Sequence, residues 1–110
     1  MVDASVAELA DRIRALLGGT DDVEERAMFG SRAFLSEGRI LVGARKGGVL
    51  LVRVCAERGA VLLTGQGVAR AVMGARTMSE NWLDVAPEAI ADDRALMEWI
   101  DLAREDAGAA

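Results

Sequence analysis

The sequence contains no histidine and no tyrosine among its 110 residues, and it has a single cysteine. Histidine is the usual general base near neutral pH and the commonest metal ligand in proteins, and tyrosine offers a phenolic acid. The chemical groups that remain are carboxylates, arginines, Cys55 and a few hydroxyls, and none of them stands in a recognisable catalytic spacing. We therefore expect a protein that is not an enzyme and that holds no cofactor and no metal.

The chain also has no second cysteine to pair with Cys55, no basic leader, and no apolar run of the roughly 20 residues that a membrane-spanning helix needs. A lone thiol without a secretion signal is typical of a reducing compartment. We expect a cytoplasmic protein that is neither exported nor embedded in a membrane. With 52% hydrophobic residues, the chain can form one domain with its own core, and we take that domain to span residues 1–110.

What the sequence does contain begins and ends with amphipathic helices. Ser5 and Glu8 form a capping box ahead of apolar residues at helical spacing, which predicts a helix over residues 5–17. Asp92 or Asp93 can cap a second helix, which runs toward the C-terminus. Acidic residues at the start of that helix favour its dipole, and we prefer this interpretation to a metal-binding cluster.

Five strands are predicted between these helices, over residues 27–35, 39–45, 49–55, 71–73 and 81–85. An acidic connector precedes the first strand, and a weak helix over residues 56–64 follows the third. The last two strands are expected to form a second hairpin on the same sheet. Together the elements predict an α+β fold, in which the N- and C-terminal helices pack on an antiparallel sheet of about five strands.

The register of the central hairpin follows from its hydrophobic pattern. A three-residue loop pairs Arg45 with Val49 and gathers most apolar side chains on one face. That face, which we expect to meet the helices, carries Ile40, Val42, Ala44, Leu50, Val52 and Val54. The opposite face, called here the outer face, then carries Arg39, Leu41, Arg45, Leu51, Arg53 and Cys55. We also expect Trp82 and Trp99 to share a core cluster.

Charge is unevenly distributed along the chain, whose net charge is −5. Residues 1–25 hold seven acids and two bases, residues 26–78 hold two acids and nine bases, and residues 79–110 hold nine acids and two bases. The basic middle segment contains the predicted outer face. We expect its arginines to pair with the acidic helices of the same molecule, and the alternative is that they form a binding face for an anionic partner.

Three short segments suggest a family. They are Met28, Phe29, Gly30 and Ser31; the strand Leu51 to Val54; and the run from Gly67 through Met78 to Pro87, followed by the Trp99 helix. In order and spacing they resemble the TfoX (Sxy) N-terminal domain family, over most of residues 6–105. The resemblance implies that family's α+β fold. Ser31 departs from the family's usual second glycine, and the chain ends at Ala110 without the second domain of full-length competence regulators, so we expect a stand-alone N-terminal-domain protein.

The resemblance implies a non-catalytic regulatory or protein-interaction domain similar to the N-terminal domain of transcription co-regulators. We expect the outer face to contact a protein partner, with a second copy of the chain as one candidate, through Arg39, Leu41, Arg45, Lys46, Leu51 and Arg53. The alternative is a module that binds DNA or another anion with the same basic face, although the arginines lack the interleaved aromatic residues that stack on single strands. A third hypothesis is an enzyme dependent on Cys55. We favour it least, because no histidine exists to act as a base for the thiol.

Overall fold

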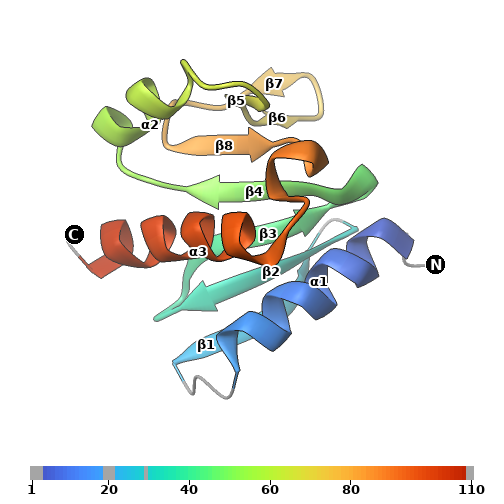
Figure 1. Ribbon diagram of the computed structural model, residues 1–110. Helices are drawn as coiled ribbons and strands as arrows, with labels where there is room; N and C mark the ends of the chain where they lie inside the picture. The colour runs from blue at the N-terminus through green and yellow to red at the C-terminus, as the bar shows by residue number, and fades with distance from the viewer. Residues whose placement is uncertain (1–3, 19–21, 29, 109–110) are drawn as a thin grey trace.

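Helices cover one face of an antiparallel sheet in the computed structural model, which describes residues 4–18, 22–28 and 30–108. Figure 1 shows α1 (Ala4–Leu17) and α3 (Asp93–Gly108) lying across the same face of the sheet, with α2 (Ala56–Leu62) near its far end. The predicted terminal helices and the weak middle helix are confirmed. Asp92 caps α3, because its Oδ1 accepts a hydrogen bond of 2.8 Å from the backbone N–H of Ala95.

The main sheet has six strands in the order β1-β2-β3-β4-β8-β5. These strands are β1 (Val23–Met28), β2 (Ser31–Ser36), β3 (Arg39–Arg45), β4 (Val49–Arg53), β8 (Trp82–Val85) and β5 (Val68–Arg70). A separate two-stranded hairpin consists of β6 (Val72–Met73) and β7 (Arg76–Thr77). Two short 3₁₀ turns, η1 (Lys46–Gly48) and η2 (Pro87–Ile90), complete the described elements. The α+β class is confirmed, with six strands in place of about five.

The predicted first strand, over residues 27–35, is wrong because the chain turns back in the middle of it. β1 and β2 form a hairpin in which Met28 pairs with Ser31, so part of the predicted acidic connector is strand β1. Gly30 adopts a φ of 78° in the turn, a conformation that glycine reaches without steric cost. Ser31 does not need that conformation and instead begins β2. Phe29 of the family motif lies outside the described residues.

The predicted register of the β3–β4 hairpin is confirmed, since Arg45 pairs with Val49. A bulge between β2 and β3 nevertheless changes the faces at the start of β3, because the register shifts between Phe34 and Leu35. An extra residue in one strand reverses the in–out alternation beyond it. Leu41 is therefore 2% exposed and belongs to the core, which corrects its predicted place on the outer face. Ile40, predicted for the core, lines a groove on the outer face.

The predicted second hairpin is also corrected. β6 pairs with β7, and β8 lies inside the main sheet between β4 and β5. α2 requires glycine at position 59, because a Cβ there would overlap the carbonyl oxygen of Glu80.

The hydrophobic core lies between the sheet and helices α1 and α3. Its fully buried side chains include Ile13, Phe34, Leu50, Leu83, Leu96 and Ile100. Trp99 packs against this core, whereas Trp82 lies on the outer face, so the predicted tryptophan cluster is wrong. In the part of the chain that the structure describes, no helix is both long and apolar enough to cross a membrane.

An ion-pair network joins α1 to the β1–β2 hairpin. The Glu25 carboxylate accepts a hydrogen bond of 2.8 Å from Nη2 of Arg14 and one of 2.6 Å from Nη2 of Arg32. The Arg14 guanidinium, supported by Arg32, lowers the pKa of the Glu25 carboxyl against the opposing effect of burial. The network therefore stabilises the fold as long as Glu25 is ionised.

We predict that Glu25→Gln lowers the free energy of unfolding by about 1–2 kcal/mol near pH 7, because a neutral amide replaces a carboxylate that accepts charged hydrogen bonds. Since folding lowers the pKa of Glu25 from its ordinary value of 4.5, its contribution is complete above that pH and disappears as the pH falls through the folded-state pKa. Urea unfolding of the wild type and of Glu25→Gln, at several pH values between neutral and acidic, measures the difference in unfolding free energy as a function of pH. A difference that stays constant down to strongly acidic pH would contradict it.

Candidate functional site

An apolar groove of about 590 Å³ lies on the outer face of the sheet. Its large apolar side chains are Met28, Ile40, Leu51, Met73, Met78 and Trp82. They come from the main sheet, from the turn end of the β1–β2 hairpin, and from the β6–β7 hairpin with the segment that follows it. A volume in this range is typical of sites that bind a small molecule or the anchoring side chains of a partner.

The floor of the groove is low because small residues meet across neighbouring strands. Ala33 of β2 stands opposite Gly43 of β3, which in turn stands opposite Leu51 of β4. With no side chain at Gly43, the outer face is hollow at its centre. A Cβ at this position would lie 3.6 Å from the Cβ of Leu51 and begin to fill the hollow.

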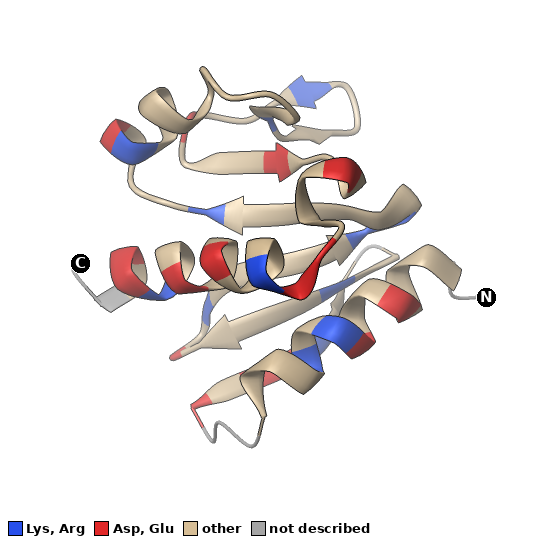
Figure 2. Cartoon of the chain, in the orientation of Figure 1, with Lys and Arg blue, Asp and Glu red and all other residues tan. Residues whose placement is uncertain are grey.

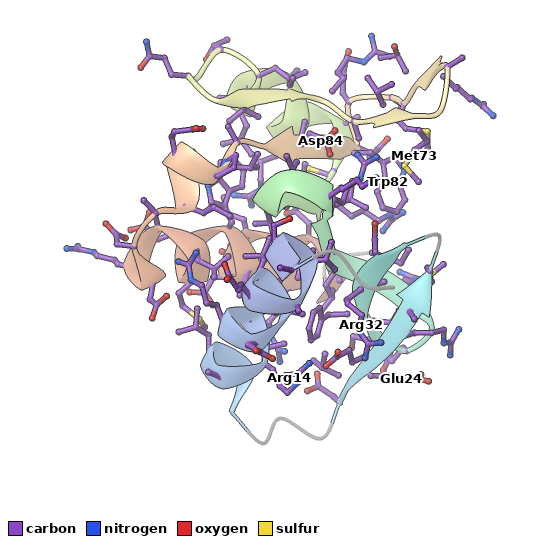
Figure 3. All side chains as sticks on the ribbon, turned by 90° about the vertical axis from the view of Figure 1, so that its right-hand side faces the viewer. Arg14, Glu24, Arg32, Met73, Trp82 and Asp84 are labelled. Atoms are coloured by element: carbon purple, nitrogen blue, oxygen red, sulfur yellow. The ribbon has the colours of Figure 1, made fainter. Side chains whose placement is uncertain are left out.

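An ion pair between β3 and β8, which reaches across the intervening strand β4, holds the β6–β7 hairpin that forms one wall of the groove. Nη1 of Arg45 donates to both carboxylate oxygens of Asp84, at 2.7 and 2.8 Å. Nη2 of Arg45 donates to the carbonyl oxygen of Val72 at 2.8 Å, and the Val72 N–H donates to Asp84 Oδ2 at 3.4 Å. The ion pair thus binds both backbone groups of a β6 residue. Figure 3 shows Met73, Trp82 and Asp84 gathered on the side of the sheet away from α1.

Trp82 is fixed at the rim by an arginine on the adjacent strand. Arg53 of β4 pairs with Trp82 of β8 in the sheet register, and its guanidinium carbon lies 5.6 Å from the centre of the indole ring. A guanidinium at this distance from an indole makes a favourable cation–π interaction. The ring is therefore restrained beside the groove.

The structure brings together only part of the predicted contact face. Arg45 and Leu51 line the groove, and Arg53 lies beside it against Trp82. Arg39 and Lys46 are exposed and lie at opposite ends of β3. The predicted face is therefore an apolar groove with arginines near it, without the continuous basic surface that the alternation suggested.

Acids of other strands in the sheet neutralise two of its arginines, contrary to the expectation that the helices would do so. Arg45 pairs with Asp84 of β8, and Arg32 pairs with Glu25 of β1. Figure 2 shows that acidic residues recur along α3. One of them, Asp106, accepts a hydrogen bond of 3.0 Å from Nε of Arg58 in α2, so this acid of α3 pairs with a neighbouring helix and not with the sheet.

Of the large apolar side chains in the groove, only Leu51 belonged to the predicted contact face, so Met28, Ile40, Met73, Met78 and Trp82 were missed. A signal for Trp82 was present, because the apolar residues Leu83 and Val85 alternate with Trp82 and Asp84 and imply two different faces. No comparable signal marks Met73 and Met78, which come from the β6–β7 region outside the regular sheet.

Cys55 is exposed. It immediately precedes α2, and its backbone N–H donates to Asp106 Oδ2 at 2.9 Å.

The fold and groove define a two-layer α+β domain with one uncovered sheet face, and comparison with known families agrees. The model of the TfoX N-terminal domain matches residues 15–107 of the 110-residue chain. The chain therefore belongs to the TfoX N-terminal domain family, which confirms the resemblance carried by its sequence motifs. The chain matches no curated protein.

We predict that Asp84→Asn lowers the free energy of unfolding by about 1–3 kcal/mol, because it leaves the Arg45 guanidinium, whose side chain is 22% exposed, without a carboxylate. Hydrogen exchange should show faster exchange of the Val72 amide, which donates to this carboxylate. Glu98→Gln is the control, since the Arg94–Glu98 pair is exposed to solvent and contributes little. Equal effects of the two substitutions would contradict the role given to the Arg45–Asp84 ion pair.

Proposed function

We propose that this domain is a non-catalytic regulatory domain that binds a protein partner through the groove on its outer face. The observation that carries the proposal is an apolar groove on the sheet face that α1 and α3 leave uncovered. Three methionines line it, and their flexible thioether side chains adapt to a bound apolar side chain. Met73 and neighbouring Val72 are 40% and 46% exposed, which favours a protein contact over permanent contact with water.

The charges around the groove indicate which partner fits. Arg32 and Arg45, the two charged residues that line it, are already paired with Glu25 and Asp84. The positive charge beside the groove that forms no ion pair among the described residues belongs to Arg53 and to exposed Arg76 of the β6–β7 hairpin. A segment with a large apolar side chain next to acidic residues would match the apolar groove and its basic surroundings. We therefore propose an acidic protein segment with an apolar anchor as the occupant.

Binding of DNA to the same face has less support. Arg45 is already neutralised by Asp84, and the Arg53 guanidinium lies over Trp82. Arg39 and Lys46, which remain exposed, lie at opposite ends of β3. Few phosphates could be neutralised together by such an arrangement.

A photo-crosslinking amino acid at Met73, introduced in cells that produce the protein, should form an adduct with one protein partner. Val61 is the matched control position, because it is an exposed apolar residue of α2 outside the groove. The identified partner is then purified and titrated against three proteins: wild type, Met73→Glu and Val61→Glu.

We expect Met73→Glu to weaken binding at least about tenfold, because it places a carboxylate in an apolar groove that receives an acidic segment. Val61→Glu should change the affinity less than about twofold. Equal binding by all three proteins would overturn the proposal. Binding of a DNA duplex that weakens steeply with salt, with no protein adduct at Met73, would favour the anion-binding alternative.

A further inference from the structure

One edge of the main sheet is a six-residue strand with no partner strand beyond it among the described residues. β1 pairs with β2 in an uninterrupted register from Val23 to Met28, and no described strand lies on its other side. In an antiparallel ladder every second residue then directs its N–H and C=O groups away from β2. The opposite edge strand, β5, has only three residues.

Folded proteins usually protect such an edge from pairing with other chains by shortening it, bulging it, or placing proline or charged residues on it. β1 is six residues long, pairs with β2 without a bulge and has no proline, so its charges are the one protection of this kind that it has. Its two exposed charges are of opposite sign and two residues apart, so that they share one face and do not repel a strand with the reverse order of charges. Within the monomer, Arg26 Nη2 donates to Glu24 Oε1 at 2.9 Å, and the two side chains are 54% and 62% exposed.

We propose that β1 pairs antiparallel with β1 of a second copy of the chain, which joins the two six-stranded sheets edge to edge in a symmetric dimer. A two-fold axis perpendicular to the sheet keeps both outer faces on the same side. Each β1 residue then stands opposite a residue that belongs to the same face of the partner's sheet. Because side chains alternate between the two faces of a strand, the two-fold axis must then pass through a residue of β1. The allowed registers therefore differ from one another by shifts of two residues.

Charge selects one of these registers. With Glu25 on the two-fold axis, Glu24 stands opposite Arg26 of the partner subunit, and Arg26 stands opposite Glu24 of the partner subunit. A shift of two residues in either direction centres the pair on Arg26 or on Glu24, and it places like charges opposite each other. Opposite charges across a strand pair are favourable and like charges are unfavourable, so the register centred on Glu25 is preferred.

The same register brings Glu25 opposite Glu25 of the partner subunit, on the face that carries the helices. Each of these carboxylates already accepts hydrogen bonds from Arg14 and Arg32 of its own chain, and its side chain is 18% exposed. Two guanidinium groups for each carboxylate offset the repulsion between the two glutamates. The dimer therefore buries no uncompensated negative charge at its axis.

The dimer would place both grooves on one continuous surface. Met28, the last residue of β1, lines the groove, so the groove begins at the strand that forms the dimer interface. A partner with two apolar anchors could then contact both subunits. The inference about the dimer rests on the β1 edge alone and does not depend on what the groove binds.

Sedimentation equilibrium of four proteins tests the register: the wild type, Glu24→Arg, Arg26→Glu, and the double variant that exchanges the two charges. We expect a wild-type dimer whose dissociation constant rises about tenfold in each single variant, because the symmetry places two like-charged pairs across the axis. The double variant should restore the wild-type constant. Arg94→Glu is the control and should change nothing, since Arg94 forms an exposed pair with Glu98 on α3.

A wild-type protein that stays monomeric at millimolar concentration would overturn the inference. So would a dimer that both single variants leave intact, or a double variant that associates no better than the single ones. Crosslinking from Met73 in the Glu24→Arg protein distinguishes a failure of the dimer inference from a failure of the proposed function of the groove. An adduct formed by a monomeric variant would show that the groove works without the dimer.

Discussion

The structure depends on a sheet that has apolar residues on both faces but helices on only one. Ala33, Leu35 and Leu51 are buried, yet they lie outside the core cluster beneath α1 and α3. The β6–β7 hairpin forms a wall over part of the outer face, and the Arg45–Asp84 ion pair holds it by the backbone of Val72. The hairpin covers the face only in part, and the groove is what remains uncovered. The Arg45–Asp84 ion pair therefore helps to set one wall of the candidate site, while the small residues Ala33 and Gly43 set its floor.

Most of the fold was predictable because it follows from local periodicity. The terminal helices and the Arg45–Val49 register both came from the spacing of apolar residues. The failures have one physical cause in common, since each depends on which strands pair and in what register. The bulge that exchanges Ile40 and Leu41 is a property of β2 and β3 together, and neither strand shows it alone. The site was predictable only where regular alternation held, as at Arg45 and Leu51, and it was missed at Met73 and Met78, which lie in and after a hairpin outside the main sheet.

The distribution of charge along the chain led to a different expectation from the one that the structure supports. A basic segment between two acidic ones suggested that sheet arginines face acidic helices or an anionic partner. Within the sheet, however, acids of other strands pair with arginines, as Asp84 of β8 does with Arg45 of β3 and Glu25 of β1 does with Arg32 of β2. Pairing in the sheet brings together residues that are far apart in the sequence, so a segment's net charge says little about the local field. The arginines near the groove thus serve mainly to hold strands and a hairpin, and the groove's apolar lining becomes its most distinctive property.

The groove and the β1 edge offer two different kinds of recognition on one domain. The groove presents side chains and adapts through its methionines, so it distinguishes partners by shape and apolar area. The β1 edge presents backbone groups, which any strand could satisfy, so its specificity must come from the charges that flank them. Glu24 and Arg26 provide that specificity only for a strand with the reverse order of charges, and an antiparallel copy of β1 has that order. The opposed charges therefore favour self-pairing at the edge, while the groove stays available for a different chain.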